Sequence, residues 1–290
     1  MNAITVSALH VYPVKGLQGH GLASAAVERC GLAGDRRWMV VDPAGRFITQ
    51  RQCPDMAKVV AEYVAGDLAL HSPGCGRLVV PRPGMRAPTV AVTVWRSTVA
   101  AQLADAASAA WLSQALGVAC RLAYLADPAA RPVDPVYGAA SDRVSFADGF
   151  PVLLTAMNSL HDLNGRLDAP VPMRRFRPNI VVGGAPAWAE DCWRRIRIGA
   201  VVFHLPKPCG RCLVITVDQE TGQRPDREEP LRALARFRRT GDGVMFGQNM
   251  IPESLGQIAV GDSVTVLEAG PSNVTPIPRT EASNRVRPPP

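Results

Sequence analysis

Short apolar or alternating segments, separated by glycine and proline turns, recur along most of this sequence. Such alternation is the pattern of a β-strand with one buried face. The segments that we expect to form strands are 4–12, 37–42, 58–64, 67–70, 77–80, 89–94, 150–154, 180–182, 195–198, 201–205, 213–217 and 264–267. Many short strands at this spacing predict a barrel or a sandwich.

A few segments have the pattern of helices instead. Residues 101–116 are rich in alanine, carry large apolar residues at helical spacing and end at Gly117. Residues 157–167 form a second candidate, with Thr155 as its N-cap. A third begins near Pro230 and runs through Phe237. The expected fold class is therefore α+β and rich in β-structure.

The length of the chain sets its organisation. With 290 residues, of which 47% are hydrophobic, it can bury one or two full cores. We expect a β-barrel-like unit at 1–100, a connecting helix at 101–119 and a second β-barrel-type unit with a few helices at 120–270. The tail at 271–290 is rich in proline and has no periodicity, which predicts disorder.

The composition of the chain indicates where in the cell the protein is located and which partners it does not bind. No apolar run is long enough for a membrane helix, and the first residues lack the pattern of a signal peptide. Seven cysteines without framework spacing favour a reducing compartment, so we expect a cytoplasmic protein with no membrane partner. The net charge is +7, part of it in the tail, and no basic stripe with interleaved aromatics occurs, so we expect no nucleic-acid partner.

A CxxC motif carries the strongest chemical signal. Cys209 and Cys212 flank Arg211, just before the predicted strand at 213–217. A redox pair of the thioredoxin type would need a helix there, and a zinc site would need further cysteine or histidine pairs, whereas the other candidates are scattered singly. Two ordinary buried cysteines are a third interpretation. A thiol beside a cation could also serve as a soft metal ligand or as a nucleophile.

Basic residues gather in two other motifs. Arg177 and Asn179 belong to a run of arginines just before the predicted strand at 180–182, where guanidinium groups would suit a phosphate or a polar heterocycle. Lys15 follows the first predicted strand in a proline and glycine turn, in a chain with only three lysines against 29 arginines. Each motif could equally be a solvated surface feature.

Taken together, the motifs resemble those of a known family. YPVKG, GLAGDRRWMVVD, FADGFPVLLT, FRPNIVVGG, PCGRCLVITVD, MFGQN and VGDSV occur in the order found in MOSC proteins that carry a MOSC N-terminal β-barrel domain. The resemblance is to the mitochondrial amidoxime-reducing components and their bacterial relatives, and it runs from about residue 3 to residue 268. It implies that the unit at 1–100 is the MOSC N-terminal β-barrel domain and that 120–270 is the MOSC domain.

The same resemblance implies a molybdenum cofactor (Mo-molybdopterin) and assigns residues to it. Cys212 would ligate the metal, and the adjacent Arg211 would favour the deprotonated thiol. Lys15, Arg36 and Arg177 fall at cofactor-contacting positions and would meet its phosphate. Asn179 and Asp148 match positions near the metal. The Asp148 carboxylate would either relay protons or merely cap the turn before the strand at 150–154.

The activity implied is that of an oxidoreductase that reduces small N-oxygenated, N-hydroxylated substrates. The alternative is a sulfur-carrier or cofactor-delivery protein, with a persulfide on Cys212 that Cys209 could resolve. A pterin-binding protein without activity is a third possibility. Because no cysteine follows Cys212, we expect no iron–sulfur cluster in the tail and a separate electron donor of the ferredoxin or flavin reductase type. Pyridoxal phosphate binding is a further family association.

Overall fold

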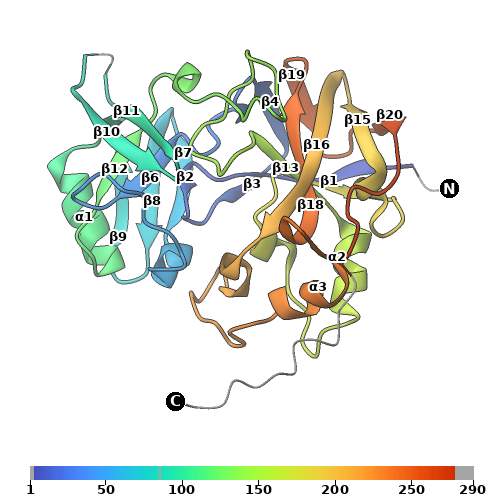
Figure 1. The fold of residues 1–290 in the computed structure, drawn as a ribbon. Helices are drawn as coiled ribbons and strands as arrows, with labels where there is room; N and C mark the ends of the chain where they lie inside the picture. The colour runs from blue at the N-terminus through green and yellow to red at the C-terminus, as the bar shows by residue number, and fades with distance from the viewer. Residues whose placement is uncertain (1–2, 85, 278–290) are drawn as a thin grey trace, which may run out of the picture.

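Two β-rich lobes lie side by side in the computed structural model, which describes residues 3–84 and 86–277 (Figure 1). The second lobe is built on the largest sheet. Its strand order is β20 (Val264–Ala269), β15 (Trp193–Ile198), β16 (Val201–Arg211), β18 (Gly243–Pro252), β13 (Val152–Ala156), β14 (Ile180–Gly183), β1 (Thr5–Val11) and β3 (His20–Leu22), with β17 (Arg239–Thr240) paired to β18. Neighbours in it are antiparallel except β13 and β14.

The first lobe contains two smaller sheets. One runs β10 (Thr89–Val94), β11 (Ser97–Leu103), β12 (Arg121–Tyr124), β6 (Trp38–Val41) and β2 (Val14–Lys15), and the other runs β7 (Val60–Val64), β8 (Asp67–Ser72) and β9 (Gly76–Val80). A third small sheet joins β19 (Gly256–Ala259), β4 (Ser24–Glu28) and β5 (Gly31–Leu32). The predicted strand-rich α+β class is confirmed, and among the described residues each sheet stays open rather than closing on itself.

The chain passes between the lobes more than once. Strand β1 pairs with β14, so the first strand of the chain lies in the sheet of the second lobe, and β4 pairs with β19 from near the other end. Conversely, β12 follows the helix at Ala106–Leu116 but pairs with β6 of the first lobe. Separate apolar cores fill the two lobes, one around Phe203 and Ile196 and another around Trp38 and Leu68. These exchanges link the two lobes through backbone hydrogen bonds.

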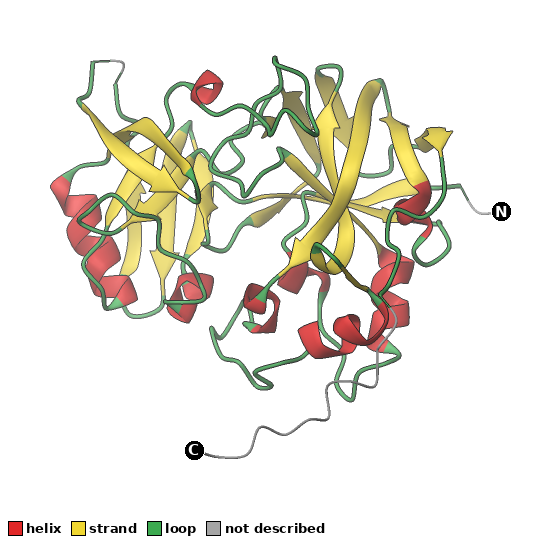
Figure 2. Ribbon diagram, in the orientation of Figure 1, coloured by secondary structure: helices red, strands yellow, loops and turns green. Residues whose placement is uncertain are grey.

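The helices are short and lie on the outside of the sheets (Figure 2). They are α1 (Ala106–Leu116), α2 (Met157–Asn164) and α3 (Leu231–Phe237), with 3₁₀ turns η1 (Pro54–Lys58), η2 (Pro128–Ala130), η3 (Met173–Phe176), η4 (Ala189–Cys192) and η5 (Leu213–Thr216). The expected helix at 101–116 begins later, because 101–103 extend β11 and Asp105 caps the helix through the Ser108 amide. It ends at Gly117 in the left-handed conformation, as predicted.

Two sequence-based assignments near the site are wrong. Thr155 does not cap α2, since it belongs to β13 and its hydroxyl donates to the Met173 sulfur. Residues 213–217 do not form a strand. The pairing of β16 with β18 stops at Arg211, and the chain then turns into η5, where the Thr216 hydroxyl donates to the Leu213 carbonyl. The apolar run buries Ile215 against Phe176 through a helical turn instead of an extended strand.

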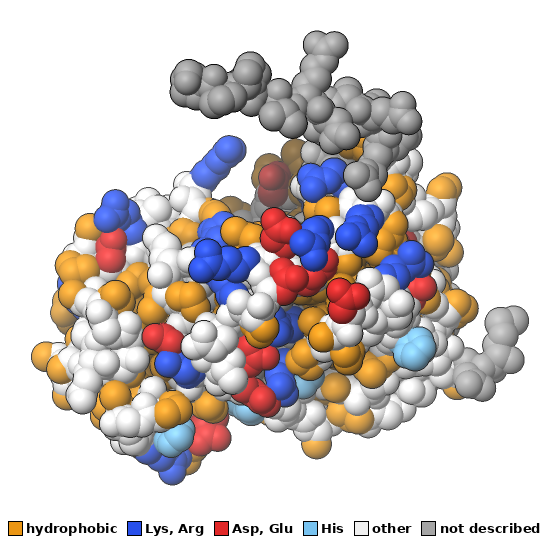
Figure 3. All heavy atoms as spheres, turned by 90° about the horizontal axis from the view of Figure 1, so that it is seen from below, with side chains coloured by type: hydrophobic (Ala, Val, Ile, Leu, Met, Phe, Trp, Pro, Cys, Tyr) orange, Lys and Arg blue, Asp and Glu red, His pale blue; other side chains and the backbone are white. Residues whose placement is uncertain are grey.

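Part of the predicted disordered tail lies within the described residues. Val274 is buried, and the Asn273 side chain exchanges hydrogen bonds with Gln248 of β18. Residues 278–290 lie outside the described part. In that described part, no helix has the length and apolar character required to cross a bilayer. On the face seen from below, basic side chains lie among acidic ones rather than in a patch of one sign (Figure 3).

Candidate functional site

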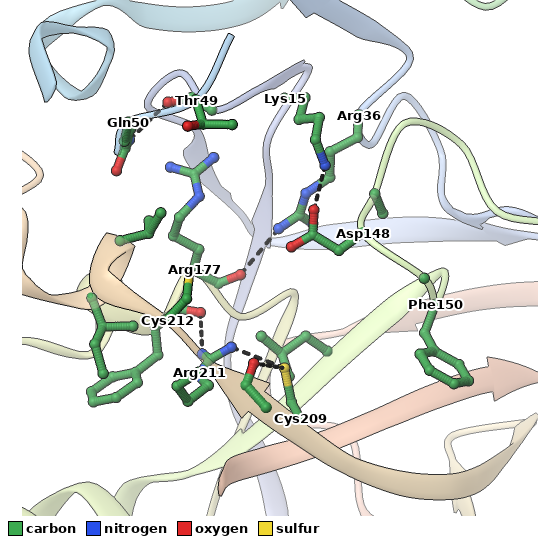
Figure 4. Close-up of a pocket in the computed structure, with 18 of the residues that line it drawn as sticks. Lys15, Arg36, Thr49, Gln50, Asp148, Phe150, Arg177, Cys209, Arg211 and Cys212 are labelled. Atoms are coloured by element: carbon green, nitrogen blue, oxygen red, sulfur yellow. Dashed lines mark hydrogen bonds and ion pairs between the residues drawn. The ribbon is translucent and has the colours of Figure 1, made fainter. Parts of the chain in front are cut away.

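A cleft that is open to solvent lies between the two lobes. The first lobe contributes residues 15–16, 36, 47–51 and 95, and the second contributes 147–150, 153, 175–177, 179, 209–212, 214–215 and 249. All seven residues that the sequence singled out line this cleft: Lys15, Arg36, Asp148, Arg177, Asn179, Arg211 and Cys212. Their roles there remain predictions, but the structure brings them to one place. Lys15, Arg36 and Asp148 lie together at one end and Cys209 and Arg211 at the other, with Arg177 and Cys212 between them (Figure 4).

Two arginines form the wall of the basic end, the end at which Lys15 lies. The Arg36 guanidinium donates to Asp35 (2.5 Å) and to the Arg177 carbonyl (3.1 Å), and both guanidinium groups lie 4.4 Å from the centroid of the Tyr12 ring. Burial lowers the pKa of Arg177 to about 10. Both arginines have left-handed backbones, with φ of 47° and 54°, a costly conformation for a residue with a side chain. Strain of this kind is commonly kept where it orients functional groups.

Lys15 and Asp148 form an ion pair across the same end of the cleft. The lysine side chain is 10% exposed and that of Asp148 is 76% exposed. Trp95 donates from its indole to the same carboxylate oxygen, at 3.0 Å. Desolvation acts to raise the pKa of Asp148, but the Lys15 charge and the hydrogen bonds from Lys15 and Trp95 hold it well below its usual range. Burial lowers the pKa of Lys15, and the neighbouring Asp148 partly offsets this.

These contacts bear on one of the two interpretations of Asp148. Its carboxylate accepts from two side chains across the cleft, and it takes no hydrogen bond from a backbone amide among the described residues. It therefore does not cap the turn before β13. The group stays ionised at neutral pH and lines the cleft, where it is paired with Lys15. A role in proton relay stays a prediction.

Asn179 is buried behind the arginines and 1% exposed. Its side-chain oxygen accepts from Arg36 (2.9 Å) and from the Leu153 amide (3.1 Å), and its nitrogen donates to the His10 carbonyl (3.2 Å). Every polar group of the side chain thus has a protein partner. In this structure Asn179 acts on the site by fixing Arg36 rather than by presenting a free group to the cleft.

The cysteine end is built where β16 ends. Cys212 is exposed and directly precedes η5, whereas Cys209 is half-buried within β16. Arg211 does not turn toward Cys212 as the sequence led us to expect: its guanidinium donates to the Cys209 sulfur (3.0 Å) and to the Phe176 carbonyl (2.5 Å). Alternate residues of a strand lie on the same face, so Arg211 meets the sulfur two positions before it.

Two arginines hold the cleft's loops, and sequence reasoning missed Arg131 and saw Arg175 only as a member of the arginine run before β14. Arg131 is buried and donates to the carbonyls of Ser145 (2.5 Å), Ala147 (2.6 Å) and Asp148 (2.9 Å). Arg175 likewise donates to the Thr216 carbonyl (2.7 Å) and pairs with Asp218, which fixes the segment after Cys212. The sequence did not indicate these structural roles, because both arginines bind backbone carbonyls that only the fold places beside them.

The lobes are also joined by side-chain amides at the edge of the cleft. Gln50 and Gln219 exchange two hydrogen bonds, of 3.1 and 2.9 Å, and Gln219 accepts a third from Arg177 (3.1 Å). Arg177 reaches in turn to the Leu17 carbonyl of the first lobe (2.7 Å). The arginine that faces the cleft is therefore held by both lobes. No sequence signal pointed to these glutamines.

Comparison with known proteins gives consistent matches. The sequence model described as MOSC N-terminal beta barrel domain matches residues 3–119, and that described as MOSC domain matches residues 141–265. The chain is 33% identical over 282 residues to mitochondrial amidoxime-reducing component 1 of Mus musculus, covering 91% of this chain and 82% of the relative. The Homo sapiens protein of the same name is 32% identical, covering 91% and 83%. The molybdenum cofactor sulfurase of Oryza sativa subsp. japonica is 29% identical, over 84% of this chain and 32% of the relative.

Proposed function

Because the chain belongs to the MOSC proteins that carry an N-terminal MOSC β-barrel domain, we propose that it is a molybdenum-cofactor-dependent oxidoreductase that reduces N-oxygenated compounds. The observation that carries the proposal is the pairing of an exposed thiol and a cluster of cations in one cleft between the lobes. The names of the relatives connect those proteins with amidoxime reduction and with the molybdenum cofactor.

The residues present fit this cofactor. The Cys212 thiol is exposed to the cleft and is the soft ligand that molybdenum takes from a protein. Lys15, Arg36 and Arg177 would face the phosphate of the pterin. The Nε atoms of Arg175 and Arg211, two further arginines of the cleft wall, are buried and have no hydrogen-bond partner. When bound, the cofactor would supply two-electron redox chemistry. In the described residues no cluster of three or more His, Cys, Asp or Glu side chains offers another metal site.

The chain's own residues would then orient the reactants and manage protons. Reduction of an N–OH group to N–H consumes two electrons and two protons and releases water. Lys15 would be occupied by the phosphate of the bound cofactor, whereas the Asp148 side chain is largely exposed at the cleft. Asp148 is therefore the group that we assign to relaying protons in the cleft, once the phosphate has taken its place beside Lys15. Phe150 and Leu153 give the cleft an apolar wall, against which part of a substrate can shed water.

The decisive experiment compares the two cysteines. Cys212→Ser and Cys209→Ser would be produced in a host that makes the molybdenum cofactor, and molybdenum, pterin and turnover of an N-hydroxylated amidine would be measured. We expect Cys212→Ser to lose molybdenum and turnover while retaining pterin, because a hydroxyl is a hard and weakly acidic donor. Cys209→Ser should keep most of both. Full activity of Cys212→Ser would refute the assignment.

A sulfur-carrier function is the second candidate, and one contact favours it. The Arg211 guanidinium donates to the Cys209 sulfur at 3.0 Å, which holds that thiol in place in the same cleft as Cys212. Cys209 could then resolve a persulfide on Cys212. An added sulfur atom found on Cys212 by mass spectrometry in protein that lacks molybdenum would favour this candidate. Equal loss of activity in both serine variants would do the same.

The enzyme proposal includes a separate electron donor. The purified protein should reduce the test substrate slowly or not at all with NADH or NADPH alone. Activity should appear when a ferredoxin or flavin reductase system is added. Direct turnover with a nicotinamide and no partner protein would contradict this part of the proposal.

A further inference from the structure

A carboxylate lies where the proposed function needs an anion to bind. Asp148 pairs with Lys15 and accepts from Trp95. Its charge also acts to raise the pKa values of Arg36 and Arg177, the other two cations of the basic end. The site that would hold a phosphate is therefore already supplied with one negative charge from the protein itself.

We propose that Asp148 is a built-in counter-ion, which occupies the anion-binding end of the cleft until a phosphate group displaces it from Lys15. The inference rests on the proposed function to the extent that the displacing group is the phosphate of the bound cofactor. It assigns to Asp148 a role in controlling access to the site.

Burial gives the reason for a counter-ion. The Lys15 side chain is only 10% exposed, and a buried ammonium without a partner is strongly destabilising. Asp148 supplies the partner from the opposite lobe, and the aromatic rings of Phe47 and Trp95 lie 5.5 and 6.0 Å from the ammonium. The ion pair thus keeps the lysine charged in the absence of a ligand.

The surroundings of Asp148 allow it to leave. Its side chain is 76% exposed, and it lies in a segment without regular secondary structure. A Cβ built on the next residue, Gly149, would meet no atom within 4 Å, so there is free space beside it. The backbone is nevertheless fixed, because Arg131 donates to the carbonyls of Ala147 and Asp148. The carboxylate can therefore swing away by side-chain rotation while the loop stays in place.

A phosphate group is suited to replace it. A phosphate monoester carries more negative charge than a carboxylate near neutral pH and offers three acceptor oxygens. It could pair with Lys15 and also approach the arginines, whereas Asp148 contacts only Lys15 and Trp95 through one oxygen. When phosphate binds, the ion pair between Lys15 and Asp148 has to break. The Asp148 carboxylate therefore lowers the affinity of the cleft for phosphate.

The test is the affinity of the cofactor-free protein for inorganic phosphate. Binding would be followed by tryptophan fluorescence, since release of Asp148 removes the hydrogen bond on the Trp95 indole, and the signal should vanish in Trp95→Phe. Asp148→Asn keeps the size of the side chain and removes its charge. We expect it to bind phosphate about tenfold more tightly than the wild type, the worth of one charge-assisted hydrogen bond.

Asp162→Asn is the matched control. Asp162 also accepts from an arginine, Arg166 (3.0 Å), and from a tryptophan indole, Trp188 (3.0 Å), but it does not line the cleft. Asp162→Asn changes the net charge by the same amount as Asp148→Asn. It should leave phosphate affinity within about twofold of the wild type, since a charge outside the cleft is screened by salt. A Lys15→Met, Asp148→Asn double variant should lose the gain, because the shared partner is gone.

Unchanged or weaker phosphate binding by Asp148→Asn would overturn the inference, as would an equal gain in Asp162→Asn. The measurement uses neither molybdenum nor pterin. If the protein proved to carry sulfur instead of reducing N-oxygenated compounds, tighter phosphate binding by Asp148→Asn would still support the counter-ion role.

Discussion

Removal of the Arg36 side chain should destabilise the fold by leaving a buried carboxylate without its partner. Asp35 is fully buried and the Arg36 side chain is 12% exposed. The guanidinium also donates to Asn179 and to the Arg177 carbonyl. Arg36→Met keeps the length of the side chain and its packing on Tyr12 but removes all of these hydrogen bonds.

The magnitude follows from the burial of the pair. Breaking a buried ion pair by removing one partner costs about 3–5 kcal/mol, because the remaining charge stays uncompensated. The matched control is Arg46→Met, since Arg46 also pairs with an aspartate, Asp42, but its side chain is 74% exposed. An exposed pair of this kind contributes about 0–1 kcal/mol.

The assay is urea unfolding followed by circular dichroism, which gives the free energy of unfolding of each variant. The double variant Asp35→Asn, Arg36→Met should recover part of the loss, because an asparagine oxygen can still accept from the Tyr12 amide without bearing a charge. A loss below about 1 kcal/mol in Arg36→Met, equal to that of Arg46→Met, would refute the reasoning. The result also matters for the site. If an Arg36 variant binds less cofactor, the measured loss of folding stability shows how much of that effect is due to unfolding.

Three further predictions concern other parts of the molecule. Burial raises the pKa of Glu190 from its ordinary value of 4.5 to about 7, so the folded state binds the proton more tightly than the unfolded state. The free energy of unfolding should therefore fall by about 3 kcal/mol as the pH rises from about 4.5 to about 7, relative to Glu190→Gln, and an equal pH dependence of both proteins in urea unfolding would contradict this. Cys212 should be the first cysteine alkylated by iodoacetamide at neutral pH, whereas Cys30, whose pKa burial raises to about 11, should stay unmodified until the protein unfolds, as peptide mass spectrometry would show. Gly247→Ala should cost about 1–3 kcal/mol, because φ is +76° there and the new Cβ would lie 2.5 Å from the Leu154 carbonyl oxygen; an unchanged melting temperature would show that the strands can move apart.

The strands that the sequence revealed are those with an uninterrupted apolar or alternating pattern, such as β1, β7, β10 and β20. The structure contains others that sequence reasoning missed, above all β18 in the middle of the large sheet. Gly247 breaks its pattern, with a positive φ and a close approach to β13. Strand β2 has two residues, too few for any periodicity. Such segments become strands only because a neighbouring strand supplies the hydrogen bonds.

The site shows the same division. The motifs led to Lys15, Arg36, Arg177 and Cys212, and the structure places all four around one cleft. The partner of each group was not predictable: Asp148 meets Lys15 across 133 positions of the chain. Arg211 was expected beside Cys212, its neighbour in sequence, but strand geometry directs it to Cys209. Proximity in sequence misled here because alternate residues of a strand share a face.

The sequence by itself determined the strand-rich fold class, the order of the motifs that mark the family and the identity of the side chains that carry the chemistry. Those properties depend on local patterns and residue types, which can be read along the chain. Only the tertiary structure decided which charges are paired, which side chains are exposed and what each hydrogen bond joins. The cleft exists because β1 lies in the sheet of one lobe and β2 in that of the other, so that the turn between them and the residues after it bring Lys15 and Arg36 opposite Asp148. Pairing and burial depend on contacts between residues far apart in sequence, and these are set by the packing of the two lobes as a whole.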